Sequence, residues 1–385
     1  MARKRRDIAV LLDIGTARIS IAVTKFGPGK SFEILAQIES PSLGVRKGVI
    51  IDIRSVARII KNLMADAREK SNISLPERIC AVFSGTGIKV KDYHLQKDLG
   101  CRRHVSAGDV SKLLNKVNEQ FNPEGLTQLH ILPLQYSLDG HLVSSAEGKI
   151  GQNLEVDVRL VLAGNESVQY IYDAVRLAGM RLRKVVFSPL VQSPLLVNGA
   201  ETELGCILVD LGAETTTVSS FKYGTLRDAL VLPVGMEHVV GDLAVGLRTT
   251  LKAAGELLQS FGLHSHQYEE SLVISIINAR LEEIYELIKQ SIHSMNFTGL
   301  IPGGVKLTGG GAMFPGMAEH LSQYLELQVL SIPPYVSVPG SDKCSVSLAG
   351  LAGYCCNYGI PGFLHAADGF ESLSNNCGYT RRRMV

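Results

Sequence analysis

Two Asp-x-Gly turns constrain the fold of this chain more than any other feature of its sequence. In each turn a short apolar run ends at an aspartate, and a glycine follows two residues later: Asp13 and Gly15 form the first, Asp210 and Gly212 the second. Each pattern predicts a buried strand, a tight turn and a second strand. A carboxylate at a strand tip can hold a hydrated Mg²⁺, and a glycine turn lets backbone N–H groups converge on an anion. One chain therefore holds two candidate phosphate turns, about 200 residues apart.

A third glycine turn lies late in the chain. An apolar run at 304–308 leads into Gly309, Gly310 and Gly311, and the start of a helix follows, with Phe314 close to it. Glycines here allow a flat ligand or a phosphate to approach the backbone, and a helix N-terminus favours negative charge. Any one such turn is more often an ordinary turn than a ligand site, but two Asp-x-Gly copies in one chain strengthen the phosphate interpretation.

Composition indicates a globular protein of two or more domains. Its 385 residues are 45% apolar and 20% charged, and a net charge of +2 gives no overall attraction to nucleic acid, so we expect no nucleic-acid partner. Seven cysteines without C-x-x-C spacing favour reduced thiols in a cytosol. No apolar run has the length of a signal-peptide core or a membrane span, so we expect a soluble protein.

The pattern of apolar residues predicts several helices around these turns. One begins at about Asp52, and a capping box of Ser106 with Asp109 opens another. Asn165 is expected to cap the next helix. The second half is expected to contain a helix at 237–260 and another from about 268 to 295. The polar, irregular segment 84–162 is interpreted as an inserted subdomain.

Taken together, the three glycine turns resemble those of the actin and heat-shock-chaperone ATPase superfamily. More specifically, the run 233–249 is similar to the stretch after the second phosphate motif of the FtsA family, the bacterial actin-like cell-division proteins. Residues 279–284 and 307–316 also resemble FtsA segments. The segment 84–162 resembles the extra subdomain of FtsA. The resemblance implies an α/β, actin-like fold with two related domains around a nucleotide cleft.

This resemblance implies a division of the chain into six parts. The first actin-like domain takes 1–83 and 163–199, with the inserted FtsA-type subdomain at 84–162 between them. The second actin-like domain takes 200–340 and includes the adenosine motif. A helix at 341–360 returns to the first domain, and 361–385 forms a tail that is a candidate for weak membrane contact.

The resemblance also implies ATP and Mg²⁺ as cofactors. Asp13 and Asp210 lie beside the Mg²⁺ through water in this interpretation, because Mg²⁺ keeps part of its hydration shell. The expected nucleotide-binding residues are Asp13, Gly15, Thr16, Ala17, Asp210, Gly212, Ala213, Thr215, Thr216, Gly255, Leu258, Gly309, Gly310, Gly311 and Phe314.

Three departures from the family pattern predict weak nucleotide binding and little hydrolysis. Ala213 and Glu214 stand where further glycines are usual, and a carboxylate there repels phosphate unless it is turned away. Gly255 and Leu258 replace a Glu and a Lys that contact the nucleoside in FtsA proteins. Ser188 precedes the proline of the domain crossing, where chaperone relatives carry a carboxylate that orients the attacking water.

The implied function is an ATP-binding, self-assembling scaffold that links FtsZ to the cytoplasmic membrane. The protein is then cytoplasmic and recruited to the inner face of the membrane at the division site. FtsZ is expected on the helix with Arg280, Glu283 and Leu287, and other division proteins on the inserted subdomain. Two alternatives stay open at this point: an active ATPase or kinase of the same superfamily, and a PilM-like component of pilus assembly.

Overall fold

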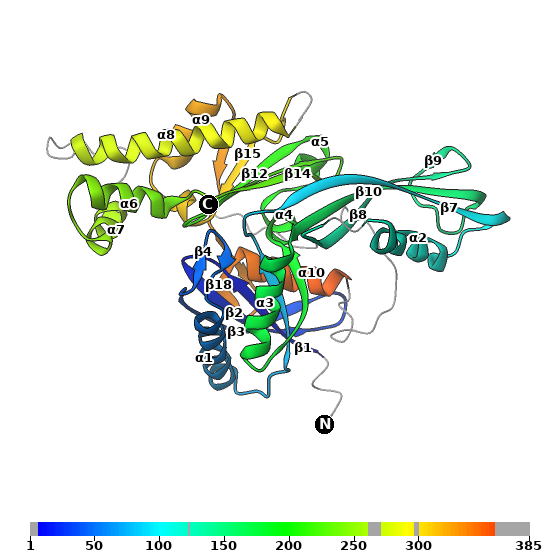
Figure 1. Ribbon diagram of the computed structural model, residues 1–385, viewed down its shortest axis with the longest axis horizontal. Coiled ribbons are helices and arrows are strands. Elements are labelled where there is room, and N and C mark those ends of the chain that lie inside the picture. The colour runs from blue at the N-terminus through cyan, green and yellow to red at the C-terminus, as the bar shows by residue number, and fades with distance from the viewer. Residues whose placement is uncertain (1–6, 122–123, 261–270, 296–299, 359–385) are drawn as a thin grey trace.

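The chain folds into two α/β lobes and a projecting insert, seen in a computed structural model that describes residues 7–121, 124–260, 271–295 and 300–358 (Figure 1). The sheet of the first lobe has the strand order β11-β6-β1-β2-β3. Strands β1 and β2 are antiparallel, as are β2 and β3, whereas β6 runs parallel to both β1 and β11. These strands are β1 (Ile8–Ile14), β2 (Arg18–Phe26), β3 (Phe32–Pro41), β6 (Arg78–Phe83) and β11 (Arg181–Phe187).

The sheet of the second lobe repeats this topology with the strand order β14-β13-β12-β15-β16. Strand β12 pairs antiparallel with β13 and parallel with β15, as β1 does with β2 and β6. The two Asp-x-Gly turns therefore occupy equivalent places, each at the end of the central strand. The strands are β12 (Cys206–Leu211), β13 (Thr216–Lys222), β14 (Thr225–Leu232), β15 (Val305–Thr308) and β16 (Val329–Ser331).

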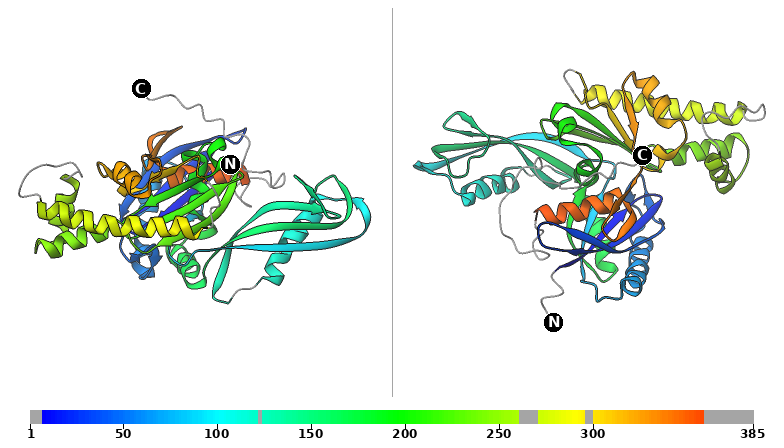
Figure 2. Two further views of the ribbon diagram at one scale, coloured as in Figure 1. Left: turned by 90° about the horizontal axis from the view of Figure 1, so that it is seen from above. Right: turned by 180° about the vertical axis from the view of Figure 1, so that it is seen from behind.

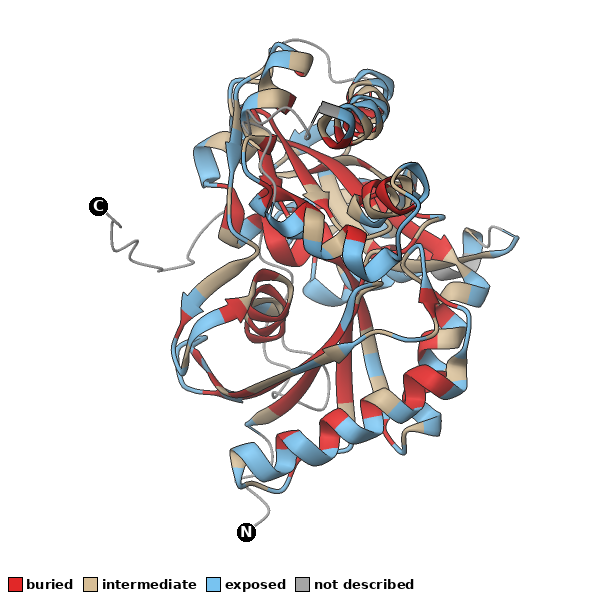
Figure 3. Ribbon diagram, turned by 90° about the vertical axis from the view of Figure 1, so that its left-hand side faces the viewer, coloured by how far each residue is buried: buried red, intermediate tan, exposed pale blue. Residues whose placement is uncertain are grey.

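Alternation along the central strands explains how helices cover both faces of the first sheet. Val10 and Leu12 pack in one apolar core with residues of α1 (Ile53–Ser71) and α3 (Asn165–Leu177). Ala9 and Leu11 point to the other face, where α10 (Val346–Tyr358) packs beside α4 (Ser188–Leu196). Figure 3 shows the strands as a buried layer with buried helix faces against it.

Among the described residues, four helices of the second lobe pack on one face of its sheet. Residues of β12 pack with α6 (Met236–Gly246), α7 (Leu251–Ser260), α8 (Ser271–Ser294) and α9 (Met317–Leu325) in a separate core. A 3₁₀ turn, η3 (Gly310–Met313), precedes α9. The remaining short elements are β4 (Val45–Arg46), β5 (Val49–Ile50), α5 (Gly199–Leu204), β17 (Tyr335–Val338) and β18 (Ser341–Ser345).

The insert is a four-stranded sheet, β7-β10-β8-β9, with one helix on it. Figures 1 and 2 show it projecting to one side of the two lobes. Its elements are β7 (Lys89–His104), α2 (Ala107–Gln120), β8 (Leu126–Leu138), β9 (His141–Val143) and β10 (Ile150–Gly164). The buried side chain of Arg159 on β10 donates to Leu226 O at 2.7 Å and pairs with Asp92, so it joins the insert to the second lobe.

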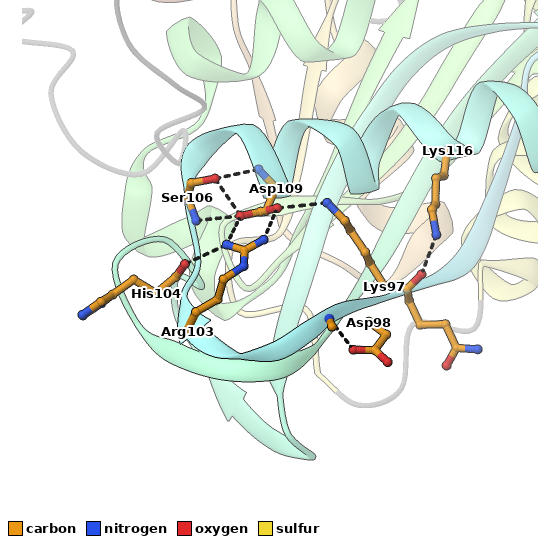
Figure 4. Close-up of polar contacts among 9 residues, drawn as sticks. Lys97, Asp98, Arg103, His104, Ser106, Asp109 and Lys116 are labelled. Atoms are coloured by element: carbon orange, nitrogen blue, oxygen red, sulfur yellow. Dashed lines mark hydrogen bonds and ion pairs between the residues drawn. The ribbon is translucent and has the colours of Figure 1, made fainter.

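The capping box at the start of α2 is confirmed and is part of a larger ion cluster (Figure 4). Asp109 pairs with Arg103 at 2.8 Å and with Lys97 at 3.0 Å, and it accepts a hydrogen bond from the Ser106 hydroxyl. Hydrogen bonds from Arg103, then Ser106 and Lys97, hold the pKa of Asp109 well below its usual range. The cluster fixes α2 against β7.

Two expectations about helices are wrong. Gly164, not Asn165, is the N-cap of α3, and the Asn165 side chain instead accepts from the Thr127 hydroxyl at 2.6 Å. The helix expected at 237–260 is two helices, α6 and α7, because the chain turns between them where Arg248 takes a positive φ of 52°. The tail at 361–385 lies outside the described residues.

Candidate nucleotide site

A cavity of about 740 Å³ lies between the lobes, and both Asp-x-Gly turns line it. The glycine turn before α9 and one face of α7 complete the lining from the second lobe. In open α/β sheets ligands bind beyond the carboxyl ends of the strands, which is where both aspartates stand. The volume falls within the usual range for small-molecule sites of roughly 300–1,000 Å³.

The two aspartates form a partly buried carboxylate pair in the cavity wall. Burial raises the pKa of Asp13 to about 7, with the Asp210 charge as the second cause and a hydrogen bond with Ser347 opposing it. Burial also raises the pKa of Asp210, against a hydrogen bond that Gln192 donates to it at 2.8 Å. Two buried carboxylates of like charge cost free energy unless a proton or a cation neutralises them.

Unpaired buried oxygens beside this pair fit a hydrated Mg²⁺. Among the described residues, Ser188 Oγ, Thr308 Oγ1 and Gln192 Oε1 are buried without a hydrogen-bond partner. Ser188 lines the cavity, and Thr308 is the strand partner of Asp210. Mg²⁺ usually retains several water ligands, and these waters can donate to such oxygens. The donor set thus suits a cation held through water, and this role of the two aspartates stays a prediction.

The two Asp-x-Gly turns have the same backbone geometry. The amide of Gly15 donates to Arg18 O, and that of Gly212 donates to Thr215 O, both at 2.9 Å. A Cβ at Gly15 would come within about 3 Å of Arg18 O, and a Cβ at Gly212 within about 3 Å of Thr215 O. Both turns therefore require glycine at this place. The turn residues that line the cavity include Thr16, Ala17, Ala213 and Thr215 in addition to the two glycines.

The expectation for Thr216 is wrong, and Thr217 takes its place. Thr216 is fully buried and donates its hydroxyl to Val234 O at 2.8 Å, away from the cavity. Thr215 and Thr217 line the cavity instead. Side chains alternate along a strand, so the two-residue period could have separated Thr216 from its neighbours.

The residues of the glycine turn before α9 have two different roles. Gly310, Gly311 and Phe314 line the cavity as expected, whereas Gly309 does not. Gly309 has a φ of 88°, and a Cβ there would overlap Asp210 and Leu211. Its role is to let this turn pack closely on the second phosphate turn.

Helix α7 presents a different set of side chains from the one that sequence reasoning selected. Gly255 and Leu258 both border the cavity, but Leu258 is only 6% exposed and belongs to the core of the second lobe. Lys252, Glu256 and Gln259 line the cavity from the same helix. Their spacing follows the helical period from Gly255, which is the signal that would have found them.

Several other cavity residues were also missed. Arg18 and Ser347 come from segments without a motif, whereas Met236 and Glu237 belong to the FtsA-like run 233–249, and Ser84 precedes a glycine in the turn after β6. They reach the cavity because the fold brings distant segments together, which single motifs do not reveal.

Glu214 does not face the cavity, so the expected repulsion of phosphate by this carboxylate is wrong. Its side chain is 15% exposed, pairs with Arg46 at 3.1 Å, and accepts from the Lys47 amide at 2.8 Å. Glu214 is absent from the cavity lining.

The three residues expected to bind a partner lie on α8. Arg280 is held within the chain, because Asp242 of α6 and Glu283 both pair with its guanidinium, at 2.5 and 2.6 Å. Leu287 packs partly buried against the core of the second lobe. Glu283 is the most exposed of the three. Their partner-binding role stays a prediction.

Comparisons with known proteins agree with this geometry. A family model described as cell division protein FtsA matches residues 207–345, and a model for the SHS2 domain inserted in FtsA matches 85–162. The two segments together make up more than half of the chain. The chain belongs to the FtsA family. The resemblance inferred from the sequence is confirmed, and this FtsA-family chain is an actin-like cell-division protein.

Relatives and solved structures extend the match beyond these segments. The cell division protein FtsA of Bacillus subtilis (strain 168) is 27% identical over 374 residues, covering 91% of this chain and 84% of the relative. That of Pseudomonas aeruginosa is 26% identical, covering 86% and 83%.

Solved structures confirm the expected fold class. The PilM-PilN type IV pilus biogenesis complex gives a TM-score of 0.65 at 18% identity, covering 86% of this FtsA-family chain and 90% of that one. Spiroplasma citri MreB5 bound to ADP gives 0.52 at 13% identity, covering 90% and 94%. At these identities the likeness shows the fold alone, so PilM offers no better account of function than FtsA. No helix in the described part of the chain is long and apolar enough to cross a membrane.

Proposed function

We propose that this protein binds Mg-ATP in the cleft between its lobes and serves as a division scaffold. In this role it assembles with copies of itself and links FtsZ to the cytoplasmic membrane at the division site. The observation that carries the proposal is the convergence of two equivalent Asp-x-Gly turns on one cavity, in a chain of the FtsA family.

Different residues of the cavity would bind the metal, the phosphates and the nucleoside. Asp13 and Asp210 would hold the hydrated Mg²⁺, which neutralises phosphate charge when bound. The backbone amides of the two glycine turns would face the phosphates. Gly310, Gly311 and Phe314 would lie against the nucleoside, because they line the same cavity beyond the second turn.

Slow hydrolysis accompanies this proposal. Ser188 begins α4 at the cavity wall, where a carboxylate would be needed to orient an attacking water. Nucleotide then regulates assembly, and the rival function of a fast ATPase or kinase predicts rapid steady-state phosphate release that Asp210→Ala abolishes.

Calorimetric titration with Mg-ATP tests the nucleotide site directly. We expect saturable but weak binding that requires Mg²⁺. Absence of any heat of binding at millimolar Mg-ATP, with the folded state confirmed by circular dichroism, would remove the nucleotide from the proposal.

Fluorescence anisotropy with the C-terminal peptide of FtsZ tests the scaffold role. We expect binding by the second lobe that Glu283→Ala weakens, while Glu319→Ala on α9 leaves it unchanged. Glu283 is chosen because it is the accessible member of the predicted set on α8. No binding at high micromolar concentration of folded protein would contradict the FtsZ link.

Replacing Gly255 by Glu should raise the affinity for Mg-ATP about tenfold, since a charge-assisted hydrogen bond to the ribose contributes about 1.5–3 kcal/mol. A Cβ at Gly255 meets only Val240 Cγ1, at 3.9 Å, so α7 accommodates the side chain. Gly255→Ala is the matched control, because it gives the same gain in helix propensity without the carboxylate. Equal affinities of the Glu and Ala variants, measured by calorimetry, would contradict this role. Leu258→Lys is a poorer test because Leu258 belongs to the core.

A further inference from the structure

The second phosphate turn carries a carboxylate that contacts the opposite lobe. Glu214 follows Ala213 in this turn, and its side chain is 15% exposed. It pairs with the Arg46 guanidinium at 3.1 Å and accepts from the Lys47 backbone amide at 2.8 Å. These two contacts are called the Glu214 bridge below, and the one with Lys47 joins residues 167 positions apart. The equivalent residue of the first turn is Ala17, which cannot make such contacts.

The far end of the Glu214 bridge is a small hairpin that is anchored in the first lobe. Strands β4 and β5 pair through Val45 with Ile50 and Arg46 with Val49. Val45 is 5% exposed and Ile50 is 2% exposed, both in the core that also contains α1. Movement of the hairpin tip therefore also moves residues in the core of the first lobe.

The hairpin tip has a backbone conformation that the bridge helps to hold. Lys47 and Gly48 have φ values of 49° and 70°, the signature of a type I′ turn. Lysine is not among the residues that favour a positive φ, so other contacts must hold it there. The Lys47 amide donates to Glu214, and the Gly48 amide donates to the Thr16 hydroxyl at 3.1 Å.

The tip is thus placed among three turns at the mouth of the cleft. Thr16 belongs to the first phosphate turn, Glu214 to the second, and a Cβ at Gly48 would come within 2.7 Å of Gly85 Cα in the turn after β6. Beside it, Ser84 Oγ and Thr217 Oγ1 form a second contact between the lobes, at 2.7 Å. Opening of the cleft at this point must break the Glu214 bridge.

We propose that Glu214 holds the second phosphate turn against the 45–50 hairpin, so that closure of the cleft at this edge depends on a contact within the protein. The hydrogen bond from the Lys47 amide to the charged, 15% exposed carboxylate is stronger than a neutral one, whereas the Arg46 side chain is 65% exposed and its ion pair is screened by water and salt. The bridge also directs the carboxylate away from the phosphate side of the turn. The inference concerns the ligand-free protein and does not rest on the proposed function.

Hydrogen exchange of the 45–50 hairpin, followed by mass spectrometry in the absence of nucleotide, tests the bridge. We expect the hairpin amides to exchange about tenfold faster in Glu214→Ala than in the wild type, the factor that loss of a charged hydrogen bond produces. Glu214→Gln keeps an acceptor for the Lys47 amide but loses the ion pair with Arg46, so its rate should be intermediate. Ala213→Gly is the matched control, because it loosens the same turn and keeps the carboxylate.

Two results would overturn the proposal. One is equal exchange of the hairpin in the wild type and Glu214→Ala, with exchange of β12 unchanged to confirm that the second lobe is folded. The other is equally fast exchange in Glu214→Ala and Ala213→Gly, since loosening of the turn and not loss of the carboxylate would then explain the change. The comparison without nucleotide decides the matter even if the protein proves to bind no ATP, so the two proposals fail separately.

Discussion

Replacing Asp13 by Asn should stabilise the ligand-free protein above pH 7 by about 2–4 kcal/mol and should abolish Mg²⁺-dependent nucleotide binding. Burial, then the Asp210 charge, raises the pKa of Asp13 from 3.8 to about 7. Between these values the folded state holds a proton that the unfolded state has lost, so wild-type stability falls as the pH rises through this window. Asparagine keeps the shape without the charge, so the gain should be near zero below pH 4 and complete above pH 7.

Chemical denaturation at several pH values, with and without Mg²⁺, measures this gain. Asp52→Asn is the matched control, because hydrogen bonds from Ser55 lower the pKa of Asp52 at the N-cap of α1. Its replacement should give no gain that grows with pH. Two results would contradict the role of Asp13 as one of two neighbouring carboxylates whose charge a bound cation neutralises. One is an Asp13→Asn protein that is no more stable than the wild type at pH 8. The other is an Asp13→Asn protein that still binds Mg-ATP with wild-type affinity.

The strands and the two aspartates could be predicted from the sequence because their signals are local. An apolar run that ends at Asp13 or Asp210 and continues into a glycine turn specifies strand, turn and strand without reference to the rest of the chain. The same holds for the helix start at about Asp52 and the capping box at Ser106, where the capping side chain and its backbone partners lie within three residues.

The errors concern side chains whose role depends on distant segments. Glu214 was expected to weaken phosphate binding unless turned away, and it is turned away because its partners lie in a hairpin of the other lobe. Leu258 borders the cavity as expected, but its low exposure is set by the other helices of the second lobe, which the sequence did not reveal. Such placements follow from tertiary packing, which overrides local preference.

Helix α10 shows how a segment without any motif determines the site. It carries Ser347, which accepts a hydrogen bond from Gln192 at 3.2 Å and whose hydrogen bond lowers the pKa of Asp13. Gln192, on α4, also donates to Asp210. The packing of α10 against α4 therefore sets the positions of Ser347 and Gln192, the side chains that contact Asp13 and Asp210. The close approach of these two helices depends on Gly350, where a Cβ would overlap the carbonyl of Val191.

Replacing Gly350 by Ala should therefore destabilise the protein by about 3 kcal/mol, since the clash is with backbone that cannot move aside without displacing a helix. Gly353→Ala, one turn later in α10, is the matched control: a Cβ there meets only Phe32 Cε1, at 3.9 Å, so the gain in helix propensity should stabilise the protein by about 0.5–1 kcal/mol. Differential scanning calorimetry of both variants should show a lower unfolding temperature for Gly350→Ala and a higher one for Gly353→Ala than for the wild type.

Mg-ATP titration of the same two proteins separates a structural effect from an effect on the site. Displacement of α10 moves Ser347 away from Gln192 and Asp13, so Gly350→Ala should bind Mg-ATP more weakly than the wild type at a temperature where it remains folded. Gly353→Ala leaves these contacts in place and should bind as the wild type does. A Gly350→Ala protein with unchanged stability would show that α10 and α4 can separate without cost, and the packing of these helices would then not determine the geometry of the carboxylate pair.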